Sequence, residues 1–318
     1  MKNVLVVLPV TEEHKKRLEK AGEGCVLNYV GEKEVTREQV QAADIILGNV
    51  PASYLACSPR LELMQLSSSG ADAYVGEGIL RPETALVNST GAYSKSVAEH
   101  TFAMILMLQK KLHLYRDDQL KAVWADEGDV VSLGSSTVAI IGLGEIGLYL
   151  ARLCKAMGAK VIGVKRRMSE CPHCVDELYT TDETDKVLPR ADVVVSILPG
   201  TPATTHFFTP ERFAMMKKSA IFINCGRGFA VSEDALYDAL TTGKIATAGV
   251  DVLEREPLPS DSPLWKLPNL FITPHASGYY HLPDTLENIV DIAEYNLSAY
   301  LSGKPLKNIV DRKTGYRA

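Results

Sequence analysis

The sequence predicts an α/β fold in which two parallel sheets are each flanked by helices. Short apolar runs rich in β-branched residues alternate with helical patterns along the chain, and this alternation is typical of parallel sheets. The chain has 318 residues, which is more than one hydrophobic core usually organises. Apolar residues make up 46% and charged residues 23% of the chain, as in folded proteins. We therefore expect two domains.

Strand candidates in the first part of the chain are short apolar runs separated by polar segments. They are residues 4–8, 25–29, 45–47, 63–66 and 85–87. Helical spacing over residues 12–20 predicts a helix that ends at Gly22, because glycine readily closes a helix. A long apolar helix over residues 96–114 is predicted to link the two domains.

The second part of the chain continues the alternation with six further strand candidates. They are residues 138–141, 160–164, 193–197, 221–224, 247–251 and 271–273. Polar residues and prolines gather over residues 167–189, which predicts a loop there. Apolar residues recur every three or four positions over 283–302, so we expect a final helix that returns to the first domain. The predicted domains are residues 1–95 with 284–318, and residues 96–283.

Charge and hydropathy argue against two classes of function. The 39 acidic and 34 basic residues are scattered, which gives a net charge of −5 and no basic surface for nucleic acid. The apolar run near the N-terminus is interrupted by Pro9 and by charged residues 12–16, and no apolar run reaches the roughly 20 residues that cross a bilayer. Six irregularly spaced cysteines suit a reducing compartment. We expect a cytoplasmic protein that binds neither membranes nor nucleic acid.

Two cysteines, Cys171 and Cys174, have the spacing of some redox and metal sites. No second pair is present to complete a four-ligand zinc site, and no thioredoxin-like pattern surrounds them. The sequence therefore favours an ordinary surface loop at this position, and we expect no bound metal.

A glycine-rich turn follows the strand candidate 138–141 and opens a helical pattern. Its residues are Gly142, Leu143, Gly144, Glu145, Ile146 and Gly147. Strand, glycine turn, helix and second strand within about 30 residues are the context that a dinucleotide-binding turn requires. Glycines at these positions allow a tight turn, close approach to a pyrophosphate and close packing of helix on strand. The sequence therefore predicts a Rossmann-like domain. The six strand candidates in the second part of the chain match the number of strands in such a domain.

The end of the next strand candidate carries three basic residues, Lys165, Arg166 and Arg167. Proteins specific for NAD place an acidic residue there, which hydrogen-bonds the ribose 2′-hydroxyl. Guanidinium groups instead pair well with a 2′-phosphate. We therefore predict that NADP is preferred and that NAD remains possible. A basic loop that is merely solvated is the alternative.

Three further motifs each follow a strand candidate. They are Asn224-Cys225-Gly226-Arg227-Gly228, Asp251 to Glu256-Pro257, and Thr273-Pro274-His275-Ala276-Ser277-Gly278. The carboxyl ends of strands in an open parallel sheet face the ligand crevice, so an arginine, a glutamate and a histidine are expected to converge there. Any one of them alone has an ordinary structural explanation, such as a surface ion pair.

With these motifs the chain resembles the D-isomer-specific 2-hydroxyacid dehydrogenases, and in particular the glyoxylate/hydroxypyruvate reductases. The resemblance extends to segments 66–72, 97–100, 198–204 and 216–218, and spans nearly the whole chain. It implies that Arg227 binds the substrate carboxylate, that His275 is the general acid or base, and that Glu256 supports His275. The backbone amides of Gly70 and Ala71 would hold the other side of the carboxylate.

The resemblance also implies a flavodoxin-like substrate domain, a set of cofactor contacts and a homodimer. The dimer would form through the cofactor domain, around Trp124. The implied cofactor-binding residues are Gly142, Gly144, Glu145, Ile146, Gly147, Lys165, Arg166, Arg167, Leu198, Pro199, Thr204, Cys225, Gly226, Asp251, His275, Ser277 and Gly278.

The function that follows is hydride transfer to a small 2-oxo acid, which gives the D-2-hydroxy acid. The sequence leaves the particular acid open. A dinucleotide-sensing protein that binds partners, like the corepressors that resemble these dehydrogenases, is the alternative from another class. A formate- or phosphite-oxidising relative is a further one. Tyr279, Tyr280 and His281 depart from the commoner family pattern, and either shape the substrate pocket or only pack.

Overall fold

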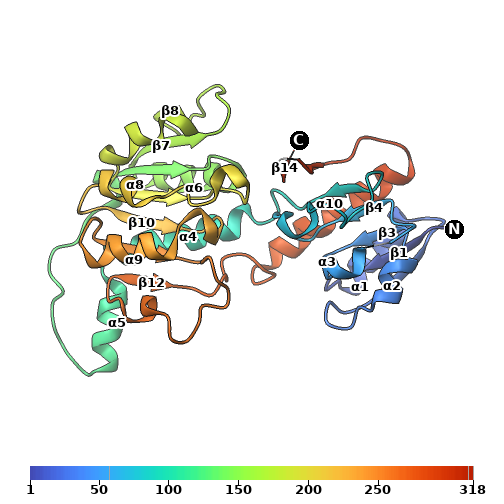
Figure 1. The fold of residues 1–318 in the computed structure, drawn as a ribbon, viewed down its shortest axis with the longest axis horizontal. Helices are drawn as coiled ribbons and strands as arrows, with labels where there is room; N and C mark the ends of the chain where they lie inside the picture. The colour runs from blue at the N-terminus through green and yellow to red at the C-terminus, as the bar shows by residue number, and fades with distance from the viewer. Residues whose placement is uncertain (57, 314, 318) are drawn as a thin grey trace. The chain divides into compact units, whose positions relative to one another are not determined.

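The computed structural model describes residues 1–56, 58–313 and 315–317, and the chain divides into two compact units. Unit 1 comprises Met1–Tyr93 with Tyr280–Ala318, and unit 2 comprises Ser94–Tyr279. Each unit is built on its own parallel sheet, as the sequence predicted (Figure 1). Within the described residues, no helix combines the length and the hydropathy that a membrane span needs.

The sheet of unit 1 has five parallel strands in the order β2-β1-β3-β4-β5. This order is that of flavodoxin-like folds, which confirms the prediction for the first part of the chain. The strands are β1 Asn3–Val6, β2 Val26–Tyr29, β3 Ile45–Leu47, β4 Leu63–Gln65 and β5 Ala85–Val87. A separate antiparallel pair is formed by β13 Val310–Asp311 and β14 Tyr316–Arg317.

Both faces of this sheet are buried, because alternate residues of each strand enter different cores. Val4 and Val6 of β1 pack in a core with residues of helices α1 and α10, whereas Leu5 and Val7 pack in a core with residues of α2 and α3. A strand covered on both faces is apolar at every position, which is why the sequence shows unbroken runs. The helices are α1 Glu12–Ala21, α2 Arg37–Ala42, α3 Ala52–Leu55 and α10 Pro283–Leu301.

The sheet of unit 2 has seven parallel strands in the order β12-β11-β10-β9-β6-β7-β8. When the sheet is followed from β8 to β12, its strand order is that of dinucleotide-binding folds, with one strand, β12, added at the edge. The strands are β6 Thr137–Ile141, β7 Lys160–Lys165, β8 Glu177–Thr180, β9 Val193–Ser196, β10 Ile221–Asn224, β11 Thr247–Val250 and β12 Leu270–Ile272.

The predicted loop over 167–189 was wrong, because it contains β8 and the short helix α7 Thr184–Val187. All four residues of β8 are half-buried, and the strand lies at the edge of the sheet. An edge strand of this kind needs no run of apolar residues, so its sequence, Glu-Leu-Tyr-Thr, lacks the signal that identified the central strands.

The predicted helix over 96–114 is two helices, α4 Ser94–Gln109 and α5 Leu112–Leu120. They separate at Lys111, whose φ of 55° is left-handed and ends helical geometry. Seven residues of α4 are buried, whereas α5 has no fully buried residue. The remaining helices of unit 2 are α6 Glu145–Ala156, α8 Pro210–Met215 and α9 Glu233–Thr241. Single turns of 3-10 helix occur at Asp72–Tyr74 in unit 1, and in unit 2 at Leu133–Ser135, Thr181–Glu183, Leu188–Arg190, Pro202–Thr204, Gly228–Ala230 and Pro263–Lys266.

Candidate active site

The glycine turn joins β6 to α6 in a conformation that side chains would prevent. Gly142 has a φ of +107°, and a Cβ built on it would lie 2.4 Å from the carbonyl oxygen of Ile197. A Cβ on Gly147 would lie 2.6 Å from the carbonyl oxygen of Gly142. Gly144 caps α6 without any side-chain hydrogen bond, so the first amides of the helix, around Glu145 and Ile146, keep their capacity to bind an anion. The turn therefore fits a dinucleotide pyrophosphate.

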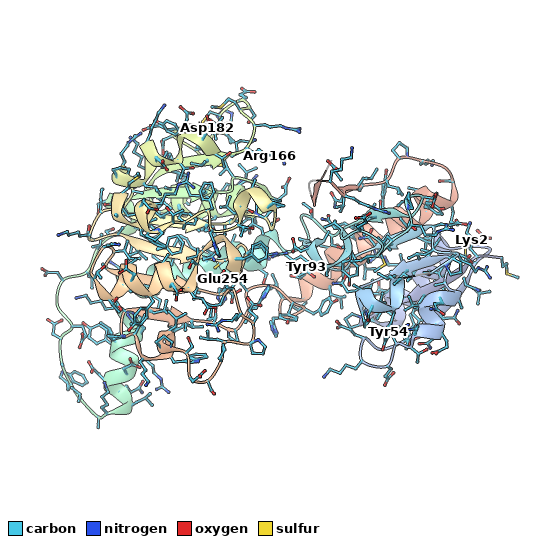
Figure 2. All side chains as sticks on the ribbon, in the orientation of Figure 1. Lys2, Tyr54, Tyr93, Arg166, Asp182 and Glu254 are labelled. Carbon is cyan, nitrogen blue, oxygen red and sulfur yellow. The ribbon has the colours of Figure 1, made fainter. Side chains whose placement is uncertain are left out.

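The basic residues predicted to read the ribose lie beside this turn. The amides of Gly142 and Leu143 both donate to the carbonyl of Val164 at 2.9 Å, directly before Lys165. The ammonium of Lys165 donates to the hydroxyl of Ser169 at 3.0 Å. Arg166 and Arg167 are exposed in the loop that follows β7, where Figure 2 labels Arg166. The end of β7 therefore carries positive charge next to the glycine turn.

The segment after β9 lies against the loop that carries Arg227. A Cβ on Gly226 would lie 2.7 Å from both the amide nitrogen and the carbonyl oxygen of Leu198. The hydroxyl of Thr204 donates to the carbonyl of Pro199 at 2.6 Å, which folds the segment back on itself. Thr204 is thus placed to hold Pro199, and its own hydroxyl is used within the loop.

Asp251, which directly follows β11, organises the histidine motif. Its carboxylate accepts from the hydroxyl of Thr273 at 2.6 Å and from the amides of Ala276 and Ser277 at 2.8 and 3.1 Å. Its carbonyl accepts from the amide of His275 at 2.7 Å. Burial acts to raise the pKa of Asp251, but hydrogen bonds from Ser277 and Thr273 and from the two amides outweigh it and leave the pKa below its ordinary value. Asp251 is therefore a buried carboxylate that fixes the motif.

His275 and Glu256 form a hydrogen-bonded pair. The Nδ1 atom of His275 lies 2.7 Å from a carboxylate oxygen of Glu256, and the two side chains are 45% and 38% exposed. The other oxygen of Glu256 accepts from the amide of Leu253 at 3.0 Å, so the carboxylate is held on both sides. The ring of Tyr279 meets the imidazole edge to face, with 6.4 Å between centroids. Chemically, this pair is a solvent-accessible imidazole oriented by an acid.

Arg227 follows β10 and is half-buried. Its guanidinium donates to the carbonyl of Gly226 at 3.1 Å, and the side-chain amide of Asn224 donates to the carbonyl of Arg227 at 3.1 Å. A Cβ on the next residue, Gly228, would lie 1.8 Å from the carbonyl oxygen of Leu253, so the arginine loop is pressed against the loop that holds Glu256.

The ends of three adjacent strands therefore bring the predicted residues of unit 2 to one edge of the sheet. Strand β11 pairs with β10 on one side and β12 on the other, and all are parallel. Arg227 follows β10, Glu256 lies in the loop after β11, and His275 follows β12. Ser277 is buried and its carbonyl accepts from the hydroxyl of Ser96 at 2.7 Å, whereas Gly278 is half-buried.

Gly70 and Ala71 belong to unit 1 and are described with it. The carbonyl of Gly70 accepts from the hydroxyl of Ser68 at 2.7 Å. Ala71 is buried and precedes the 3-10 turn that begins at Asp72. The structure thus gives these two residues a defined turn in the substrate-domain candidate.

Sequence reasoning did not single out Thr273 and His100 as supports of the site. Thr273 donates to Asp251, and Nε2 of His100 lies 3.1 Å from the hydroxyl of Thr273 and 3.7 Å from the carboxylate of Asp251. Both residues lie in motifs that the sequence analysis used, so the motifs themselves were the available signal. Cys225, predicted as a cofactor contact, is buried, and burial raises the pKa of its thiol to about 12, which keeps it neutral.

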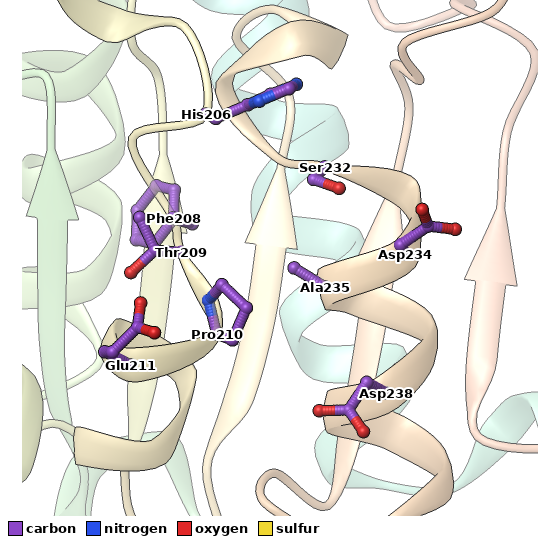
Figure 3. A pocket seen from close by; sticks show the side chains of 9 residues that line it. All are labelled: His206, Phe208, Thr209, Pro210, Glu211, Ser232, Asp234, Ala235 and Asp238. Carbon is purple, nitrogen blue, oxygen red and sulfur yellow. The ribbon is translucent and has the colours of Figure 1, made fainter.

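A separate cavity of about 430 Å³ lies between α8 and α9, and His206 at its edge pairs with Glu254 in the loop that carries Glu256. Figure 3 shows Glu211 on one side and Asp234 and Asp238 of α9 on the other, with His206 at one end. None of its lining residues is a predicted site residue, so we place the candidate site at the strand-end loops that carry Arg227, Glu256 and His275. In the described part of the chain, no group of three or more metal-ligating side chains is arranged to hold a metal ion.

The chain was compared with known proteins. Residues 102–277 match the family model of the D-isomer specific 2-hydroxyacid dehydrogenase, NAD binding domain. The chain is 34% identical over 278 residues to glyoxylate/hydroxypyruvate reductase B of Escherichia fergusonii, with 85% of each chain covered.

Solved structures agree with the family match. A D-isomer specific 2-hydroxyacid dehydrogenase family protein of Aeromonas salmonicida has a TM-score of 0.86 and 33% identity, with 98% of this chain and 99% of that chain covered. The NADPH-dependent glyoxylate/hydroxypyruvate reductase of Sinorhizobium meliloti, in complex with NADP and sulfate, has a TM-score of 0.84 and 27% identity, with 99% and 100% covered. The motifs, the fold and these matches together show that this chain belongs to the family of NAD(P)-dependent D-isomer-specific 2-hydroxyacid dehydrogenases.

Proposed function

We propose that this enzyme is an NADPH-preferring reductase that converts a small 2-oxo acid to the D-2-hydroxy acid, with His275, Glu256 and Arg227 as its catalytic residues. The observation that carries the proposal is the 2.7 Å pair between His275 and Glu256, because the loop of Glu256 adjoins the one that carries Arg227. The glyoxylate/hydroxypyruvate reductases among the relatives support a short-chain substrate such as glyoxylate or hydroxypyruvate.

His275 is the proton donor in the direction of reduction. Glu256 holds Nδ1, so the proton on Nε2 is the one that can be transferred to the carbonyl oxygen of the substrate. In the oxidation direction, His275 accepts the proton from the hydroxyl group instead.

Arg227 binds the substrate through its carboxylate and carbonyl oxygens. Its planar guanidinium offers two parallel N–H donors to a carboxylate, and it stabilises negative charge that develops on the carbonyl oxygen. The bound nicotinamide supplies the hydride. We assign substrate binding also to Gly70 and Ala71, so that unit 1 is the substrate domain and unit 2 the cofactor domain.

The cofactor assignment rests on charge. The end of β7 carries three consecutive basic residues, Lys165, Arg166 and Arg167. An acidic residue at this place would repel a 2′-phosphate, whereas guanidinium groups bind it. A structural relative carries NADP. We expect the Arg166→Gln/Arg167→Gln variant to lose affinity for NADPH by about tenfold or more, while affinity for NADH changes little. Fluorescence titration of each reduced dinucleotide measures both.

The catalytic assignment is tested by kinetics with NADPH and a panel of 2-oxo acids. We expect Arg227→Lys to lower kcat/KM by about 100-fold or more, since lysine keeps the charge but not the fork, and His275→Asn to lower it by about 100- to 10,000-fold. NADPH should bind both variants normally. Near-normal turnover by either variant contradicts the assigned role. Normal NADPH binding by the wild type without turnover of any 2-oxo acid would favour the partner-binding alternative.

We also propose a homodimer through the segment after α4. Five large apolar side chains are exposed there within residues 120–131, and Trp124 is fully exposed. In Figure 1 this segment extends away from the sheet of its own unit. A second copy would cover the exposed apolar side chains. Light scattering should show a smaller species for Trp124→Ser than for the wild type. Trp265→Ser, at an exposed tryptophan elsewhere in unit 2, is the control and should have the mass of the wild type. Equal masses for all three proteins contradict the proposal.

A further inference from the structure

The loop between β7 and β8 holds two thiols as well as the basic residues of the cofactor site. It begins after Lys165 and ends at Asp176, which is fixed by two hydrogen bonds with the backbone of Val161, both at 2.8 Å. Cys171 and Cys174 lie within it, and both are free thiols. The loop is therefore short and held at both ends, so a change within it moves its other residues.

The two thiols have different contacts and are accessible. The thiol of Cys171 donates to the carbonyl of Val175 at 3.4 Å, and that of Cys174 lies 4.0 Å from the carbonyl of Leu148 in α6, the helix that the glycine turn opens. Cys171 is exposed and Cys174 is half-buried. Cys154 and Cys225, by contrast, are buried, and burial raises the pKa of each thiol to about 12.

We propose that Cys171 and Cys174 are a redox-active dithiol, and that its oxidation to a disulfide weakens the binding of NADPH. The second half of this proposal rests on the proposed role of Arg166 and Arg167. The spacing, with two residues between the cysteines, is that of dithiols that close easily. Val175 donates to the carbonyl of Pro172 at 2.9 Å, so a turn lies between and just after the two cysteines.

Closing the disulfide has a structural consequence for the loop. It brings the two Cβ atoms to about 3.5–4.5 Å, so the thiols can no longer keep both of their present contacts with Val175 and Leu148. The turn must shift, and Arg166 and Arg167 lie only a few residues before it on the same fixed loop. The shift displaces them from the 2′-phosphate and leaves the glycine turn in place.

The chemistry balances with a small-molecule disulfide as oxidant. Cys171 and Cys174 react with one molecule of oxidised glutathione to give one protein disulfide and two molecules of reduced glutathione. Two protein S–H bonds and one glutathione S–S bond break, and one protein S–S bond and two glutathione S–H bonds form. The protein is oxidised by two electrons, and glutathione is reduced by two.

The experiment equilibrates the full-length protein in glutathione redox buffers. Mass spectrometry of the tryptic peptide 168–186, which contains both cysteines and no other, reports the disulfide as the loss of two hydrogens. We expect NADPH affinity to fall by about tenfold on oxidation, within the usual range of coupling between sites, and NADH affinity to stay unchanged. By linkage, saturating NADPH should then raise the midpoint potential of the dithiol by about 30 mV, whereas NADH should not.

The Cys171→Ser/Cys174→Ser variant is the control for both halves. It should bind NADPH as the reduced wild type does and should not respond to oxidised glutathione, and Cys25→Ser, at a half-buried cysteine of unit 1, should behave as wild type. A peptide that stays reduced at every glutathione ratio overturns the dithiol. A disulfide that forms without changing NADPH affinity overturns the coupling. If the reduced protein binds NADH as tightly as NADPH, the cofactor proposal fails, and the peptide mass still decides whether the dithiol exists.

Discussion

Asp251→Asn should destabilise unit 2 by removing one acceptor from a buried site that has only donors around it. The carboxylate accepts from the hydroxyl of Thr273 and from the amides of Ala276 and Ser277. An asparagine side chain has one acceptor oxygen. If that oxygen keeps the bonds from Thr273 and Ala276, its NH₂ group faces the amide of Ser277, and two donors meet.

The magnitude follows from these three bonds. A buried donor left without a partner costs about 1–3 kcal/mol, and bonds to a neutral oxygen are weaker than bonds to a carboxylate by about 1 kcal/mol each. The neutral side chain recovers part of the cost of burying a charge, so we expect a net loss of about 3 kcal/mol. For a domain of this size, that loss lowers Tm by about 6–12 °C. Turnover should fall by about tenfold or more, because the segment that Asp251 fixes carries His275.

Scanning calorimetry and steady-state kinetics on the same preparations measure both effects. Asp182→Asn, at an exposed position in unit 2, is the matched control and should change neither. Because the folded-state pKa of Asp251 is lowered, its contribution is present above its unfolded pKa and is lost as pH falls below about 4, so the difference in Tm should narrow there. A variant that melts within about 2 °C of the wild type at pH 7 would refute this reasoning.

Two further predictions concern the edge strand and the arginine loop. Hydrogen bonds from charged partners, above all from Arg190, lower the pKa of Glu177 to about 2. The stability that Glu177 contributes is therefore present above about pH 4.5 and is lost toward pH 2. In circular dichroism melts, Glu177→Gln should lower Tm at pH 6 and leave it unchanged at pH 2. Gly228→Ala should prevent folding or abolish turnover, because its Cβ would lie 1.8 Å from the carbonyl oxygen of Leu253, whereas Gly31→Ala meets only the exposed side chain of Glu34 and should be tolerated. Expression and melting of the two variants separate these outcomes, and a stable, active Gly228→Ala enzyme contradicts the close contact.

The central strands were predictable because burial on both faces requires apolar residues at every position. Strand β6, for example, is buried from Val138 to Ile141, and this is visible as an unbroken run. Strand β8 was not predictable in this way, because a half-buried edge strand is satisfied by polar residues. The break at Lys111 was missed because helical propensity continues through it, and neither glycine nor proline marks the left-handed residue in the sequence.

The candidate site was predictable as a set of strand ends, but not as a set of contacts. Residues that follow parallel strands share one edge of the sheet, so motif order alone placed Arg227, Glu256 and His275 at the ends of neighbouring strands. The hydrogen bonds of Asp251 depend on how the histidine loop folds back toward β11, and no spacing in the sequence reports that. The support from His100 likewise depends on the packing of α4 against the sheet.

The backbone contacts at three glycines explain why these loops act as one structure. Gly142 is pressed against the end of β9, Gly226 against Leu198 in the same segment, and Gly228 against Leu253 in the loop of Glu256. Each loop therefore fixes the next through main-chain atoms, from the glycine turn to the loop that carries Glu256. Because main-chain contacts of this kind leave no room for a Cβ, the residues between them are held at fixed separations whatever side chains the surface loops carry. A site assembled in this way permits variation at exposed side chains such as Tyr279, while the geometry that links the glycine turn to His275 stays constant.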